Sequence, residues 1–156
     1  MLNTNDYCPL SVAVMLRKKG YHEETRCYYI DGNPALLHYT YYDSSETGEN
    51  DLSVQDFNSK PYNICAAPTM QEVVNWLREK HYIELWVEPK LEMGDARNIF
   101  FNHEYVCKGI NLYKDPGKFI ILEDRCHLAE GPQWNSYAQA LAVGIIKALE
   151  LLPDKK

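Results

Sequence analysis

The segment from Pro68 to Val87 constrains the fold more than any other part of the sequence. Thr69 and Glu72 form a T-x-x-E capping box directly after the proline, which is a strong start signal for a helix. Apolar residues then follow at helical spacing: Val73, Trp76 and Leu77. The alternating segment Tyr82–Val87 comes directly after this helix, and alternation is typical of a half-buried strand. The sequence therefore predicts a mixed fold in which a helix passes straight into a strand.

Two further helices are predicted, one near each end of the chain. The first covers residues 11–19, where Ser11 can cap the start and Gly20 suits the position after the end. The last begins at Ser136, and Pro153 stops it. Its predicted buried stripe is Ala140, Leu141, Ile145, Ala148, Leu149 and Leu152. Gly144 inside this helix indicates a neighbour that leaves no room for a side chain.

The remaining strands are predicted from β-branched and aromatic enrichment between turn signals. Cys27–Ile30 and Leu36–Tyr42 flank a D-G-N-P turn, and Phe100–Cys107 and Lys118–Leu122 form a later pair. The predicted order is helix, two strands, a loop, helix, three strands, helix. Hairpin links favour antiparallel pairing, so we expect one α+β domain over residues 1–156, with a mainly antiparallel sheet and helices packed on one face.

Length and composition restrict the class of protein. The chain has 156 residues, of which 46% are hydrophobic and 24% charged, and this mix is typical of one globular domain. No apolar run reaches the roughly 18 residues that a membrane span needs. The first residues also lack the basic and apolar regions of a signal peptide. We therefore expect a soluble cytoplasmic protein that does not contact membranes.

The net charge of −6 comes mainly from one segment. Residues 43–56 hold five acidic residues and no basic one, so the rest of the chain is close to neutral. A surface of this kind does not attract a phosphate backbone, and we expect no nucleic-acid partner. The segment 43–60 is predicted to be a mobile acidic loop.

Three blocks of sequence resemble a known group of proteins. They are LRKKGYHEETRCYY (16–29), APTMQEVVNWLREKHYIELWV (67–87) and SYAQALAVGIIKALELL (136–152). Together they resemble a family of uncharacterised small proteins from bacteriophages and prophages of gut bacteria. The resemblance implies the same architecture and a mobile-element origin. It implies no activity, cofactor or catalytic residue.

Aromatic residues on the predicted strands are the strongest physical indication of a binding surface. If helices cover one face of the sheet, every second residue of the strand 82–87 points toward them into the core. Tyr82 and Trp86 alternate with these core residues and therefore lie on the other face. His103 and Tyr105 are candidate neighbours on the next strand. Since Tyr and Trp dominate protein interfaces, we expect this face to bind a protein partner or a second copy. The alternative is that the acidic loop or residues 88–98 fold over it.

An alternative from another class is a small enzyme or ligand-binding domain that uses a Cys, His and acid cluster. The five cysteines form no C-x-x-C, so we expect reduced thiols and neither a metal nor another cofactor. His103 and Cys107 share a strand face but stand roughly 13 Å apart, too far to share an ion. Cys65 precedes a helix start, where a thiol can have a lowered pKa. The sequence contains no nucleotide-binding or nucleophile-elbow motif, so we expect no catalytic residue.

Overall fold

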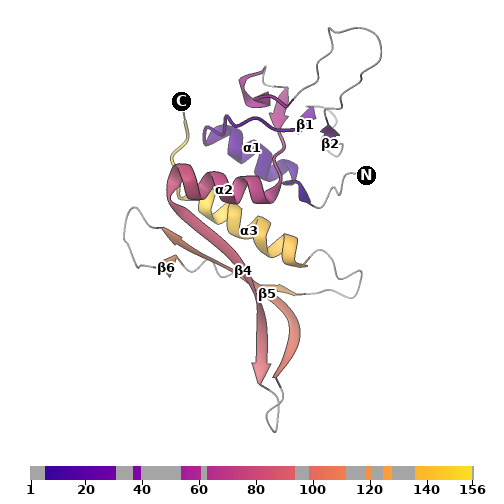
Figure 1. The fold of residues 1–156 in the computed structure, drawn as a ribbon, viewed down its shortest axis with the longest axis vertical. Coiled ribbons are helices and arrows are strands. Elements are labelled where there is room, and N and C mark those ends of the chain that lie inside the picture. Colours follow the sequence, from indigo (N-terminus) through magenta and orange to yellow (C-terminus); the bar gives the residue numbers. More distant parts are fainter. Residues whose placement is uncertain are drawn as a thin grey trace. The chain divides into compact units, whose positions relative to one another are not determined.

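The computed structural model of the chain describes residues 6–30, 37–39, 54–60, 63–93, 99–111, 119–120, 125–127 and 136–155. Within these residues, three α-helices combine with two antiparallel sheets, which confirms the predicted α+β class (Figure 1). The contacts divide the chain into two compact units. One consists of Met1–Thr69 with Leu152–Lys156, and the other of Met70–Leu151. The single domain over residues 1–156 stays a prediction.

The first unit contains helix α1 (Leu10–Lys18) and a three-stranded antiparallel sheet of order β2-β1-β3. The strands are β1 (Cys27–Ile30), β2 (Leu37–Tyr39) and β3 (Ile64–Ala66). The predicted hairpin is thus found, and its turn lies outside the described residues. Strand β3 was not predicted, because a run of three residues is too short to show alternation.

The ends of α1 differ in how well the sequence predicts them. The helix begins one residue early, after Pro9, so Ser11 lies inside the first turn and is not the cap. At the other end Gly20 has φ +84°, as expected of the residue that ends a helix in the left-handed conformation. The amides of Gly20 and Tyr21 bond back to carbonyls of the last turn at 3.2 and 3.0 Å. This pair of bonds is a Schellman motif, and it explains the requirement for glycine.

A short 3-10 helix, η2 (Phe57–Ser59), occupies the end of the predicted acidic loop. Asn58 is buried there, donates to the Tyr21 carbonyl at 2.8 Å and accepts from the Ala66 amide at 3.0 Å. This end of the loop therefore forms part of the core of the first unit, which differs from the expectation of mobility. Residues 43–53 lie outside the described residues.

The second unit alternates a helix, a sheet and a helix. Its elements are α2 (Met70–His81), β4 (Ile83–Met93), β5 (Ile99–Asn111), β6 (Phe119–Ile120), β7 (Arg125–His127) and α3 (Ser136–Glu150). The helix α2 starts directly after Thr69, as the capping box predicts. The sheet has the order β4-β5-β6, and β7 pairs with another part of β5. Every pairing is antiparallel, as expected.

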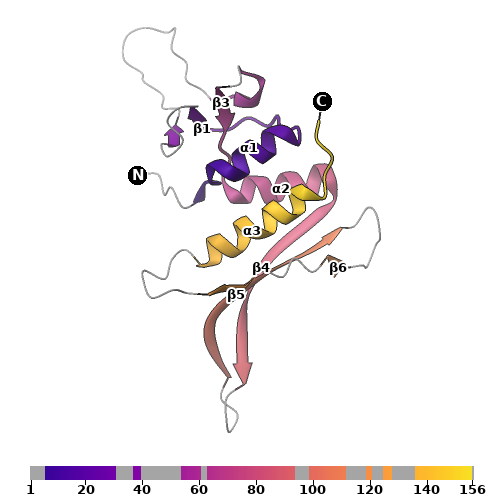
Figure 2. The same ribbon diagram turned by 180° about the vertical axis from the view of Figure 1, so that it is seen from behind.

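Helix α3 packs on one side of the β4–β5 hairpin, and the far part of the hairpin projects beyond it (Figures 1 and 2). A Cβ atom on Gly144 would lie 2.1 Å from the Cys107 Sγ atom on β5. The prediction that Gly144 has a close neighbour is therefore confirmed. The fully buried residues of α3 include four of the predicted stripe: Ala140, Ile145, Ala148 and Leu149.

Candidate functional site

The β4–β5 hairpin has two faces with different surroundings. Ile83, Leu85 and Cys107 are buried, and Cys107 approaches Gly144, so this is the face that α3 covers. The residues between them in the alternation lie on the opposite face, which we call the Trp86 face. It consists of Glu84, Trp86 and Glu88 on β4 and Val106, Lys108 and Ile110 on β5. All six are half-buried, and none belongs to the core.

Trp86 is held in place by two charged neighbours. Its indole Nε1 donates to Glu88 Oε1 at 2.8 Å, and Lys108 Nζ lies 2.8 Å from Glu88 Oε2. Trp86 and Lys108 are also direct partners across the two strands. The Lys108 ammonium, and then the indole, lower the pKa of Glu88 below its ordinary value. The carboxylate therefore stays ionised and fixes the position of the indole.

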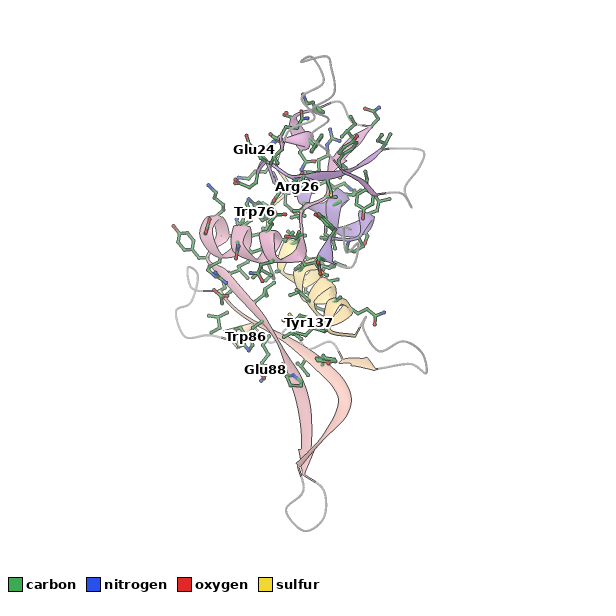
Figure 3. All side chains as sticks on the ribbon, turned by 45° about the vertical axis from the view of Figure 1, so that its right-hand side comes forward. Glu24, Arg26, Trp76, Trp86, Glu88 and Tyr137 are labelled. Carbon is green, nitrogen blue, oxygen red and sulfur yellow. The ribbon has the colours of Figure 1, made fainter. Side chains whose placement is uncertain are left out.

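A second charged pair borders this face. Arg78, in the last turn of α2, donates from two of its three guanidinium nitrogens, Nε and Nη2, to Glu84, with Nη2 2.8 Å from Oε1. This bidentate geometry links the end of the helix to the first residues of β4. Figure 3 shows Trp86 and Glu88 on the hairpin and Tyr137 at the start of α3. The Trp86 face is thus a partly apolar surface with ordered charges.

The structure places the other predicted site residues differently. Tyr82 does not belong to a strand, because it lies between α2 and β4 with φ 57°, and it is 51% exposed. The alternation that grouped it with Trp86 therefore begins one residue too early. Tyr105 shares the face of Cys107, and its ring stands 5.9 Å from that of Tyr137 on α3. It is on the helix-covered face and not beside Trp86.

His103 lies on β5, and its side chain is outside the description. Lys108 was missed by the sequence reasoning, which ended the strand at Cys107. Its pairing with Trp86 depends on the register of the hairpin, and no local pattern reveals that register.

Four cysteines have described side chains. Cys8, Cys27, Cys65 and Cys107 are buried and form no disulfide bond. Burial raises the pKa of Cys65 to about 11, although the nearby Arg17 guanidinium acts in the opposite direction. The lowered pKa that a position before a helix start can give is therefore not found at this thiol. Desolvation outweighs any effect of the helix start, which lies several residues away.

The chain carries few other features that indicate a function. In the part of the chain that the structure describes, no three His, Cys, Asp or Glu residues are grouped to hold a metal ion. No helix among the described residues is long and apolar enough to cross a membrane. No protein-family model, curated protein or solved structure matches the chain. Among the described residues, the Trp86 face is therefore the candidate site.

Proposed function

We propose that this chain is a small cytoplasmic accessory protein of phage or prophage type, which acts through protein contact or self-association and not by catalysis. The observation that carries the proposal is the position of Trp86. A large aromatic residue lies on the sheet face that α3 leaves uncovered, with its indole N–H already bonded to Glu88. Aromatic residues in such a setting are the usual anchors of protein interfaces.

The surroundings of Trp86 support binding in a second way. Glu84 is paired with Arg78 and Glu88 with Lys108, so the charges beside the indole are held in fixed positions before any partner arrives. Such preorganisation reduces the conformational entropy lost on association. The raised pKa of Cys65 bears only on that residue: a neutral buried thiol is a poor nucleophile.

Solvent access to the Trp86 indole tests the proposal. The protein is labelled with 5-fluorotryptophan, and its fluorine resonances are recorded in dilute solution with and without a soluble gadolinium chelate. Trp86→Phe assigns the Trp86 resonance, and buried Trp76 serves as the internal control because it is only 5% exposed. We expect the Trp86 signal to broaden much more than that of Trp76. An equally protected Trp86 in a monomer would overturn the proposal.

A further inference from the structure

We propose that the Trp86 face docks on the Trp86 face of a second copy of this chain, in a symmetric dimer. This inference rests on the proposed function and names the partner. It is carried by the arrangement of charges on the two strands. On β4, Trp86 stands between two carboxylates, Glu84 and Glu88. On β5, Lys108 is the residue paired with Trp86, and its ammonium lies 2.8 Å from Glu88 Oε2.

The face carries charges of both signs, the two carboxylates on β4 and the ammonium of Lys108 on β5, so it can be complementary to a copy of itself. Ion pairs between the copies then add to the pairs that Glu84 and Glu88 make within each chain. Consider a two-fold axis that runs parallel to the strands, midway between the two copies and above the line that separates β4 from β5. This axis lays β4 of one copy over β5 of the other. The indole of Trp86 then meets the ammonium of Lys108 from the second copy, a cation–π contact. The same operation brings Glu88 of one copy near Lys108 of the other. Each contact occurs twice, as in every isologous interface. A face whose charges all had the same sign would instead favour a foreign partner of opposite charge.

Pairing through the outer edge of β4 is less favourable than pairing through the face. Pro89 lies in the middle of this strand and has no N–H to donate. The register with β5 also shifts between Pro89 and Leu91, which bends the strand. Prolines and irregularities of this kind protect edge strands from pairing with another chain. The face is therefore the surface through which two copies associate.

The size of the Trp86 face sets the expected affinity between two copies. From Glu84 to Glu88 the strand rises about 14 Å, and two strands together are about 10 Å wide. The footprint per copy is then about 140 Å², well below the roughly 800 Å² of a standard stable interface. We expect a weak, reversible dimer with a dissociation constant of about 10–1,000 μM, so mass must be measured over a concentration series.

The test is sedimentation velocity of the whole chain from about 10 μM to 1 mM, a range chosen to span this affinity. Trp86→Ser and Lys108→Glu are expected to stay monomeric throughout, while the wild type approaches twice the monomer mass. Lys108→Arg keeps the cation and should dimerise at least as well. Tyr82→Ser is the matched control, because it removes an exposed aromatic residue outside this face and should behave as the wild type. Circular dichroism checks that each variant is folded.

The outcomes separate this inference from the proposed function. A wild type that remains monomeric at 1 mM, with an accessible indole, overturns the dimer and leaves the face for a foreign protein. A dimer that persists in Lys108→Glu also overturns it, because the contact then uses another surface. An indole that is protected in the monomer overturns both proposals. If Trp86→Ser fails to fold, the Lys108→Glu and Lys108→Arg pair decides the question.

Discussion

The contact between α3 and β5 predicts that Gly144→Ala destabilises the protein, although alanine is the better helix former. A Cβ atom at this position would lie 2.1 Å from Sγ and 2.9 Å from Cβ of Cys107. The sulfur can move by rotation about χ1, but the Cys107 Cβ atom is fixed to the strand backbone. The overlap between the new Cβ atom and the Cys107 Cβ atom is therefore removed only if α3 and β5 move apart. Overpacking of a core costs roughly 1–3 kcal/mol and occasionally more.

The helix propensity acts in the opposite direction. Alanine in a helix interior is favoured over glycine by about 1 kcal/mol. Because both close atoms belong to one residue and one of them cannot rotate away, we expect an overpacking cost of about 3 kcal/mol. The net loss in free energy of unfolding is then about 2 kcal/mol.

Urea unfolding followed by circular dichroism measures this loss. Ala142→Gly, at a half-buried position of the same helix, measures mainly the propensity term, with an expected loss of at least about 1 kcal/mol. Cys107→Ala removes Sγ, so the double variant with Gly144→Ala should recover part of the loss through a favourable coupling of about 0.5–3 kcal/mol. A Gly144→Ala protein that is as stable as the wild type would refute the reasoning, because the helix and strand would then have room between them.

Three further predictions concern single side chains. Tyr82→Gly should raise the free energy of unfolding by about 0.5–1 kcal/mol, because φ 57° strains any residue with a Cβ atom. Urea unfolding measures this change, and a loss of stability would contradict the prediction. The fluorine resonance of Trp86 should shift on acidification, since the lowered pKa of Glu88 keeps the carboxylate charged until the pH falls below the ordinary carboxyl range. Glu88→Gln should abolish the shift. Cys65, with a pKa of about 11, should react slowly with iodoacetamide at pH 7 and faster as the pH approaches 11. Mass spectrometry of the peptide that contains Cys65 measures the labelling. Rapid labelling at pH 7 would contradict the raised pKa.

The elements that the sequence predicts well are those with local signals. The capping box at Thr69 marks the start of α2, and Gly20 marks the end of α1, because both signals depend on hydrogen bonds within a few residues. Strand β3 is held by its pairing with β1, and η2 by the bond from Asn58 to the Tyr21 carbonyl, 37 residues earlier. A local window contains neither contact, although Asp56 caps η2 from within the same segment.

The candidate site shows the same division between local and distant information. Alternation along β4 is local, and it correctly separated Trp86 from the buried Ile83 and Leu85. It failed at Tyr82, because the chain needs a left-handed residue to leave α2 and so starts the strand one residue later.

The partners of Trp86 on β5 depend on hairpin register, in which a shift of one residue exchanges the two faces. Tyr105 was thus expected beside Trp86 but lies with Tyr137, while Lys108 takes the position opposite the indole. The ammonium on which the proposed docking of two copies depends therefore comes from the strand whose register the sequence does not reveal. A second copy was expected from the aromatic face alone, but the proposed geometry of the contact required the register.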